Sequence, residues 1–292
     1  MATTTAGAFD DFNTTITPTK ATWDKVYARR DVVVSAVKSA FPATSDMSYQ
    51  SHKIIGSLGR NTASNPVADI DLLVHLHVDP ELWEKSYRYN SSDFLYRVRD
   101  KLNGSSSVRK VGARGQAVRL FYQDGLIVDV AAVEKYTGGG YGIPDGSGGW
   151  LTTDPLQHES YLNQRNNDLD GHLKKVIRFA KKWNAAHSSR LSSFHLEMMV
   201  ARTFASMSGD SRKALQLFFD YNHYNLSVQD PAGYSGDLSS YLTSSNRDAV
   251  NASLASARDR ANLALAAERD GDHRESIRLW RIVLGGDFPT YG

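Results

Sequence analysis

The feature that most constrains this chain is a pair of aspartates inside an apolar run, a short way after a glycine-flanked serine. The segment Gly56-Ser57-Leu58-Gly59-Arg60 precedes Asp69-Ile70-Asp71, and the apolar residues after the aspartates predict a β-strand. Alternate strand residues share one face, so Asp69 and Asp71 point the same way. Adjacent carboxylates repel each other unless a cation lies between them. The pattern predicts a hard-cation site beside a turn whose N–H groups and hydroxyl suit a phosphate.

A third carboxylate, Asp129, lies in another apolar, strand-like run, Gly125–Val133. A charge there is costly to bury without a partner, and a metal ion would supply one. Three carboxylates that hold two metal ions can stabilise both the attacking and the leaving oxygen of a phosphoryl transfer. In this interpretation Asp69 and Asp71 bridge the ions, and Asp129 helps to remove the proton of the attacking hydroxyl. The alternative, ordinary surface or hydrogen-bonded aspartates, is weakened because the three occur together with the Gly-Ser turn.

Composition limits the number of domains and the cellular compartment that we expect, but it does not identify the function. The 292 residues suffice for one large or two moderate domains, and the absence of cysteine excludes disulfides and thiolate metal sites. The first residues lack the features of a signal peptide, and no apolar run is long enough to span a bilayer, so we expect a cytoplasmic protein without membrane contact. A net charge of +2 implies that any basic surface is local.

The hydrophobic pattern changes near the middle of the chain and predicts two domains, 1–150 and 151–292. The first combines helices with a mixed or antiparallel sheet: helices at 19–41 and 93–102, and strands at 69–74, 108–111, 117–121 and 126–133. Gln123-Asp124-Gly125 predicts a hairpin turn, and the glycine-rich segment 137–149 predicts a loop or crossover. Asp154-Pro155 then predicts the start of a mostly helical half, with Gln157 completing a capping box.

The Gly-Ser turn, the Asp-x-Asp pair and the third strand aspartate resemble the polymerase-β-type nucleotidyltransferases. The second half resembles the bacterial CD-NTases, relatives of cyclic GMP-AMP synthase and oligoadenylate synthase that make cyclic oligonucleotide second messengers in anti-phage defence. The residues that carry this likeness are Trp150–Pro155, Ile177–Asn184, Ser193–Glu197, Asp230-Pro231 and Asp287–Pro289.

The resemblance implies an α+β fold with a polymerase-β-like sheet lobe, a mostly α-helical second lobe and a cleft between them. It implies two Mg²⁺ ions, with Mn²⁺ as a substitute, and nucleoside triphosphates: ATP, and GTP or pyrimidine triphosphates as further substrates. Carried over to this chain, it places Gly56 and Ser57 at the donor triphosphate and the metals on Asp69, Asp71 and Asp129. Lys181 would contact phosphate, and Ser193 would lie near the nucleotide.

Several polar residues have two interpretations. Arg60 either touches the substrate or holds the loop, and Asn163 and Asn166 either read a base edge or belong to a polar helix face. Lys174, Arg178 and Lys181 share a helix face that could simply be solvated, an interpretation favoured for Lys174. Glu197 is interpreted as structural.

The predicted function is an enzyme that joins nucleoside triphosphates through 3′–5′ or 2′–5′ linkages, releases pyrophosphate and cyclises the product to a di- or trinucleotide. The alternatives are a nucleotidyltransferase acting on RNA or a small molecule, and a catalytically silent nucleotide-binding regulator. Animal relatives carry a zinc-bound thumb, which a chain without cysteine cannot build. Neither zinc nor activation by duplex DNA is expected, whereas a regulatory protein partner is compatible with the resemblance.

Overall fold

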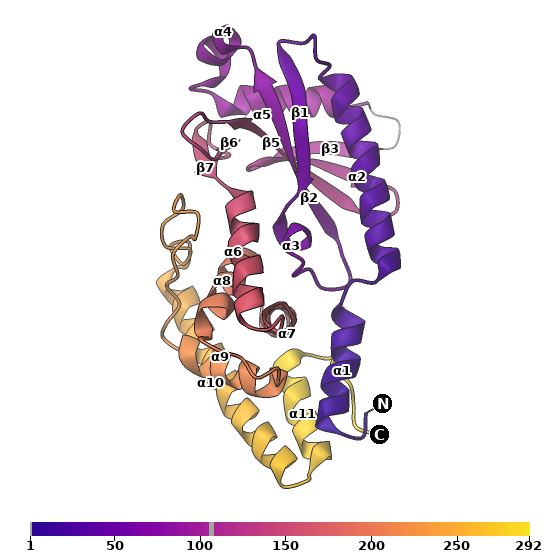
Figure 1. Cartoon of the computed structure of the whole chain (residues 1–292), viewed down its shortest axis with the longest axis vertical. Coiled ribbons are helices and arrows are strands. Elements are labelled where there is room, and N and C mark those ends of the chain that lie inside the picture. Colours follow the sequence, from indigo (N-terminus) through magenta and orange to yellow (C-terminus); the bar gives the residue numbers. More distant parts are fainter. Residues whose placement is uncertain (1, 105–107) are drawn as a thin grey trace. The chain divides into compact units, whose positions relative to one another are not determined.

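The computed structural model describes residues 2–104 and 108–292, and the chain divides into two compact units (Figure 1). The sheet unit comprises Pro18–Arg60 and Val67–Glu159. The helical unit comprises Met1–Thr17, Asn61–Pro66 and Ser160–Gly292.

The sheet unit is built on a mixed sheet with strand order β1-β2-β5-β4-β3, to which β6 is added through β5 and β7 through β6. Strands β2 and β5 run parallel, and the other pairs are antiparallel. The strands are β1 (Met47–Ile54), β2 (Asp69–Val78), β3 (Val108–Arg114), β4 (Ala117–Tyr122), β5 (Ile127–Lys135), β6 (Tyr141–Pro144) and β7 (Trp150–Thr153). Along the central strand β2, residues 70, 72, 74, 76 and 78 on one face are all buried, whereas most residues on the other face, Asp69 and Asp71 among them, are partly or fully exposed.

Two long helices cover this sheet, and shorter segments connect the strands. Helix α2 (Lys20–Ala40) packs against β1 and β2, α5 (Ser91–Leu102) packs against β3 and β4, and the two helices contact each other. Buried Val26, Val33 and Val37 follow helical spacing along α2. The connecting segments are α3 (Gly56–Gly59), α4 (Pro80–Leu82) and the π-helical turn η1 (Trp83–Tyr87).

The helical unit surrounds an aromatic core. Its helices are α1 (Thr5–Ile16), α7 (Leu173–Ala186), α8 (Ser193–Thr203), α9 (Ser211–Asn222), α10 (Ser244–Arg269) and α11 (His273–Leu284), together with most of α6 (Pro155–Asp168). Phe9 of α1 packs edge-on against Phe179 and Trp280, with ring centroids 5.3 Å and 5.0 Å away. Both termini lie side by side, where the Ala2 N–H donates to the Thr290 carbonyl at 3.2 Å (Figure 1).

The division into units differs from the predicted boundary at residue 150 in three segments, the last of which, residues 151–159, belongs to the sheet unit. Residues Met1–Thr17 and Asn61–Pro66 belong to the helical unit although they precede the sheet strands in sequence or lie among them. For the first segment the reason is apolar packing: Phe9 and Phe12 of α1 are buried in the aromatic core of the helical unit. For the second it is a set of hydrogen bonds from α7, described below.

Most predicted elements are present, but α1 and β1 were not predicted, and the glycine-rich segment is more than a loop. The expected loop at 137–149 contains β6, because Tyr141 and Gly142 pair with Lys135 and Glu134 of β5. The hairpin at residues 123–125 is present between β4 and β5. The α6 cap also forms: Asp154 Oδ1 accepts the N–H of Gln157 at 3.1 Å, and the Gln157 amide donates to Asp154 Oδ2 at 2.9 Å. Among the described residues, no helix has both the length and the apolar character needed to cross a bilayer.

Candidate active site

Two of the three predicted metal-binding aspartates lie directly opposite each other on adjacent strands. In the parallel pairing of β2 with β5, Asp71 is opposite Asp129 and Asp69 is opposite Ile127. Asp69 is the exposed first residue of β2, Asp71 is partly buried, and the Asp129 side chain is 14% exposed. Because Asp69 and Asp71 alternate along one strand, the structure gathers all three carboxylates, hereafter the aspartate triad, at one end of the β2–β5 pair.

The Gly-Ser turn packs against the triad. It forms the single helical turn α3, and the Ile55 N–H just before it donates to the Asp71 carbonyl at 2.9 Å. Gly56 has φ +63°, and a Cβ there would lie 1.8 Å from Asp71 Oδ2; a Cβ on Gly59 would lie 2.5 Å from the Ile54 carbonyl oxygen. Only glycine fits either position without displacing its neighbours. Gly56 therefore allows the turn to approach the Asp71 carboxylate closely, and Gly59 allows it to pack against the Ile54 backbone.

The triad carries more negative charge than its surroundings compensate. The pKa of Asp71 is raised to about 6, chiefly because burial disfavours its charged form and also because of the negative charges of Asp69 and Asp129. Arg60, which is buried, and Arg119 act in the opposite direction without cancelling this rise. The site therefore favours the addition of positive charge.

Arg119 is a site residue that sequence reasoning missed. It lies on β4 opposite Asp129, and its Nε and Nη2 donate to Asp129 Oδ1 and Oδ2 at 2.7 Å and 2.5 Å. The hydrogen bonds that Arg119 donates to Asp129 are the main reason that the pKa of Arg119 is raised above its usual value. The sequence did contain an indication, because a hairpin centred on Asp124 places the equidistant residues 119 and 129 opposite each other.

The carboxylate oxygens of the triad are suitable ligands for a divalent cation, but the three side chains are not arranged to coordinate one as they stand. Three carboxylates are the oxygen ligands that Mg²⁺ and Mn²⁺ prefer, and the raised pKa of Asp71 marks a charge that a cation would relieve. Within residues 2–104 and 108–292, no three or more His, Asp or Glu side chains are grouped closely enough to hold a metal ion as they stand. Asp129 instead gives both oxygens to Arg119.

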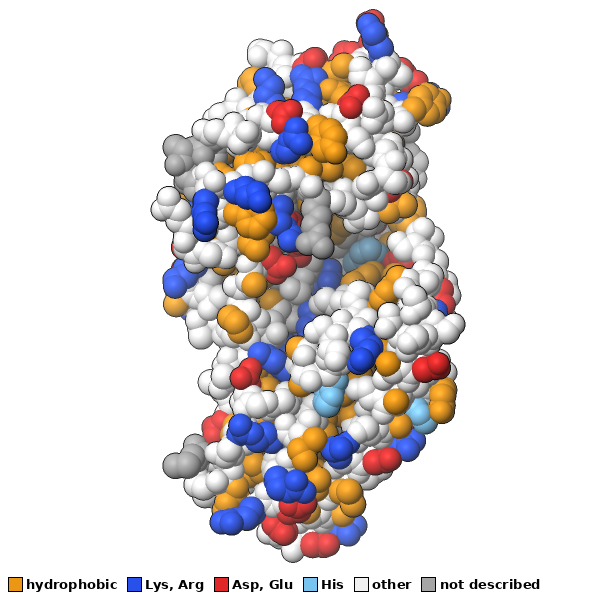
Figure 2. Space-filling model, turned by 180° about the vertical axis from the view of Figure 1, so that it is seen from behind, with side chains coloured by type: hydrophobic (Ala, Val, Ile, Leu, Met, Phe, Trp, Pro, Cys, Tyr) orange, Lys and Arg blue, Asp and Glu red, His pale blue; other side chains and the backbone are white. Residues whose placement is uncertain are grey.

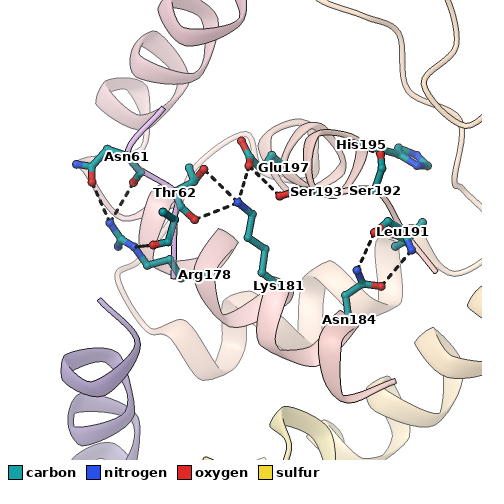
Figure 3. A network of polar contacts seen from close by, with 11 residues as sticks. Asn61, Thr62, Arg178, Lys181, Asn184, Leu191, Ser192, Ser193, His195 and Glu197 are labelled. Carbon is teal, nitrogen blue, oxygen red and sulfur yellow. Dashed lines mark hydrogen bonds and ion pairs between the residues drawn. The ribbon is translucent and has the colours of Figure 1, made fainter. Parts of the chain in front are cut away.

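In the helical unit, the predicted nucleotide-binding residues Lys181 and Ser193 belong to a partly buried polar network that we call the Lys181 cluster: Lys181, Glu197, Thr62 and Ser193 (Figure 3). Lys181 Nζ lies 2.6 Å from Glu197 Oε1 and donates to the Thr62 carbonyl at 3.1 Å and hydroxyl at 3.3 Å. The Ser193 hydroxyl donates to the same Glu197 oxygen at 3.5 Å. Glu197 is completely buried, so it brings Lys181 and Ser193 together from the protein interior.

The basic face of α7 is not simply solvated, which was one interpretation of its sequence. Arg178 donates to the carbonyls of Ala63 at 3.2 Å and Asn61 at 3.0 Å, and Lys182 donates to that of Asn65 at 2.9 Å (Figure 3 shows Arg178). These bonds, with those of Lys181, hold residues 61–65 in the helical unit. Lys174, for which a solvated position was favoured, donates from Nζ to Asn163 Oδ1 at 2.6 Å.

The remaining predicted residues also have local partners. Asn166 accepts the Lys174 N–H through its side-chain oxygen at 3.2 Å, so it caps the first turn of α7. His195, next to Ser193, contacts the Leu226 carbonyl through Nε2 at 2.7 Å and the Tyr241 hydroxyl through Nδ1 at 3.1 Å. The substrate roles of Arg60, Asn163 and Asn166 stay predictions.

The fold and the site together define a class. A mixed sheet that carries three aspartates beside a glycine-flanked serine turn, followed by a helical unit, is the architecture of a polymerase-β-like nucleotidyltransferase. Residues 1–166 match the family model of the Second Messenger Oligonucleotide or Dinucleotide Synthetase domain. The chain therefore belongs to this family, the bacterial CD-NTases, and is a nucleotidyltransferase.

Individual relatives support the same assignment. A probable cyclic nucleotide synthase of Bacillus cereus (strain VD146) is 28% identical over 280 residues, which cover 83% of this chain and 84% of the relative. Vibrio cholerae DncV, a cyclic AMP-GMP synthase, has a similar fold with a TM-score of 0.78 at 14% identity, covering 97% of this chain and 96% of DncV. CdnC of Escherichia coli MS115-1, solved with ATP, gives a TM-score of 0.75 at 19% identity, with 97% and 98% covered.

Proposed function

We propose that this enzyme joins nucleoside triphosphates with loss of pyrophosphate and closes the product into a cyclic di- or trinucleotide second messenger. The observation that carries the proposal is the in-register pair of Asp71 and Asp129, packed against the Gly-Ser turn in a domain of the synthetase family. The pairing brings carboxylates from distant parts of the sequence to one place, next to the turn proposed to bind a triphosphate.

The triad would hold two divalent cations, Mg²⁺ or Mn²⁺. When bound, such ions stabilise the charge that develops on the attacking and leaving oxygens of an in-line phosphoryl transfer. Asp69 and Asp71 would bridge the ions. Asp129 would accept the proton of the attacking hydroxyl, which requires that its carboxylate be turned at least partly away from Arg119.

The Gly-Ser turn would bind the donor triphosphate. Backbone N–H groups of a tight turn and a serine hydroxyl are suitable donors to phosphate oxygens. Gly56 and Gly59 support this role, since the close approach of backbone and carboxylate leaves no room for side chains at either position. Ser57 lies between them and would supply the hydroxyl.

On the basis of their family positions, Lys181 is proposed as a further phosphate contact and Ser193 as a residue near the nucleotide. The structure supports a shared role, because both bind the same oxygen of buried Glu197. A phosphate would have to compete with Thr62 and Glu197 for the Lys181 ammonium. A charge-assisted bond to a multiply charged phosphate is strong enough to make such an exchange reasonable.

The test is incubation of the purified protein with the four ribonucleoside triphosphates and Mg²⁺ or Mn²⁺, singly and in pairs. The products are then treated with phosphatase and identified by mass. Phosphatase-resistant cyclic products that require a divalent cation would support the proposal. Products of the same mass from Asp69→Asn with Asp71→Asn would contradict the assigned site.

The same experiment separates the alternatives. Elongation of added RNA without a cyclic product would indicate a template-independent nucleotidyltransferase. Tight ATP binding without any product, in the presence of every candidate activator tested, would indicate a regulator without catalytic activity.

We extend the proposal to anti-phage signalling under the control of a protein partner. The support is indirect: CdnC of E. coli MS115-1, which shares the fold, was solved in a complex with HORMA-deltaN. The test is plaque formation on a bacterial host that carries the intact gene with its neighbours or the Asp69→Asn, Asp71→Asn variant. Equal plaque numbers in the two strains would contradict a defensive role.

A further inference from the structure

The Arg119–Asp129 pair occupies an unusual position in the sheet. Strand β5 lies between β2 and β4, so Asp71, Asp129 and Arg119 form one row across three adjacent strands. Two members of the row are negative and one is positive. The guanidinium binds the Asp129 carboxylate through both oxygens, the most specific geometry that an Arg–carboxylate pair can adopt.

This geometry conflicts with a role of Asp129 as an unhindered cation ligand. Each Asp129 oxygen already accepts a hydrogen bond from Arg119, and both side chains are largely buried, at 27% exposed for Arg119 and 14% for Asp129. A divalent cation that binds the triad must therefore share the Asp129 carboxylate with the guanidinium or displace it. In both cases the positive charge of Arg119 opposes the incoming ion.

We propose that Arg119 is the internal counter-ion of the triad: it holds the Asp129 carboxylate in the metal-free enzyme and competes with the divalent cation for it. Arg119 is thus a positioning residue that acts through Asp129. The inference rests on the proposed metal site. It implies that a free divalent cation binds weakly until a substrate brings further ligands, so that the enzyme does not hold catalytic ions firmly when no triphosphate is present.

The simpler explanation is that Arg119 and Asp129 form an ordinary cross-strand pair that only stabilises the sheet. The sheet unit contains another arginine–aspartate pair, with a more exposed carboxylate, that separates the two explanations. Arg29 Nη2 lies 2.5 Å from Asp124 Oδ2, the same distance as between Arg119 Nη2 and Asp129 Oδ2, but Asp124 is in the β4–β5 turn and outside the triad. Arg29 is also largely buried, at 18% exposed.

The experiment measures Mn²⁺ binding to the nucleotide-free, full-length protein by electron paramagnetic resonance, with thermal unfolding in parallel. The variants are Arg119→Met, Arg119→Lys and Arg29→Met, with Asp69→Asn, Asp71→Asn as the metal-site control. We expect Arg119→Met to bind Mn²⁺ about fivefold or more tightly than wild type, because an opposing unit charge is removed beside the ion. Arg119→Lys, which keeps the charge without the two-pronged geometry, should lie between them.

The unfolding data give a second readout. In EDTA, Arg119→Met should unfold at a lower temperature than wild type, and Mn²⁺ should restore most of the loss. Arg29→Met should lower the unfolding temperature without changing Mn²⁺ affinity, and Mn²⁺ should not restore it.

Two results would contradict the inference about Arg119. If wild type binds Mn²⁺ better than the Asp69→Asn, Asp71→Asn control but Arg119→Met binds it equally or more weakly, the inference about Arg119 is overturned and the metal site stands. If wild type and that control bind Mn²⁺ alike, including in the presence of ATP, the proposed metal site fails, and with it the inference.

Discussion

The two charged clusters of this enzyme, the aspartate triad and the Lys181 cluster, differ in how their charges are compensated. In the triad, three carboxylates share the nearby charges of Arg119 and Arg60, and the pKa of Asp71 rises to about 6. In the Lys181 cluster, one ammonium faces one buried carboxylate at 2.6 Å and also bonds to the backbone. The first arrangement favours an added cation, whereas the second is satisfied internally. Substitutions in the triad should therefore act mainly on chemistry, and those in the Lys181 cluster also on stability.

The largest effect should come from Asp69→Asn with Asp71→Asn. Without the ions, the enzyme loses the electrostatic stabilisation that dominates phosphoryl transfer, and synthesis should fall by about 10³-fold or more. Asparagine keeps the side-chain shape, so circular dichroism and the unfolding temperature in EDTA should be unchanged or slightly improved. Substantial cyclic product from the folded double variant would show that the surplus charge of the triad serves another purpose.

Substitution of Glu197 should leave the positive charge of Lys181 without its counter-charge in the Lys181 cluster. Glu197→Ala leaves the Lys181 ammonium, only 12% exposed, without its buried partner and should cost about 3–5 kcal/mol in the free energy of unfolding. The double variant Lys181→Met, Glu197→Leu removes both charges and should recover most of that stability. Denaturant unfolding of the singles and the double gives the coupling energy. Additive effects would contradict the view that Glu197 and Lys181 act as one buried pair.

The contrast between these clusters could be predicted only in part. The sequence indicated the three aspartates, because charges interrupt apolar strand runs. The parallel pairing of β2 with β5 was not predictable, since the register of Asp71 with Asp129 depends on the whole sheet. The partners of Arg178 and Lys181 were equally hidden. They include backbone carbonyls of residues 61–63, which no side-chain pattern reveals.

The titration of Asp71 should affect the stability of the fold and the affinity for Mn²⁺ in opposite ways. A carboxyl whose pKa in the folded protein exceeds its unfolded value of 3.8 stabilises the fold when protonated, so its contribution is complete below about pH 4 and is lost as the pH rises through about 6. In EDTA the loss should be roughly 3 kcal/mol at most. Mn²⁺ affinity should change in the opposite sense and strengthen as the pH rises to 6, because the ion requires the ionised carboxylate. The charges that face Asp71 are those of Asp69, Asp129, Arg60 and Arg119.

A matched control exists elsewhere in β5. Burial also raises the pKa of Glu134 to about 6, beside His77 and the Val78 N–H, so it contributes to stability with the same sign. Glu134→Gln should reduce the pH dependence of stability and leave that of Mn²⁺ binding intact, whereas Asp71→Asn should reduce both. If Asp71→Asn leaves the pH dependence of stability unchanged, the electrostatic description of the triad is wrong.

Single phosphate contacts should have smaller effects. Ser57→Ala and Lys181→Ala each remove one proposed hydrogen bond to a charged group and should weaken ATP binding in the presence of Mg²⁺ by about tenfold. The comparison between clusters predicts a further difference: Lys181→Ala lowers the unfolding temperature without ligand, because Glu197 loses its partner, and Ser57→Ala does not. The measurement is a thermal-shift titration with ATP. Lys175→Ala, on the same helix but paired with Asp10 at 3.6 Å, is the control. An ATP-induced shift equal to wild type in both variants would place the phosphate contacts elsewhere.

The smallest effect, none within error, is expected from duplex DNA and from zinc chelation. Activation by a polyanion needs cations that are free to bind phosphates, but those of α7 have partners inside the helical unit. Lys174 binds Asn163, Lys175 lies near Asp10, and Arg178, Lys181 and Lys182 bind the backbone of residues 61–65. On the face shown in Figure 2, Lys and Arg side chains are scattered among acidic and apolar ones, consistent with the net charge of +2.

The test is synthesis with and without long duplex DNA at low and moderate salt, and with a zinc-selective chelator. A large gain with DNA that disappears as salt rises would show that phosphate contacts outcompete these internal partners. The residues of the Lys181 cluster would then exchange their internal partners for phosphates, and the internal hydrogen bonds described here would exist only in the absence of the activator.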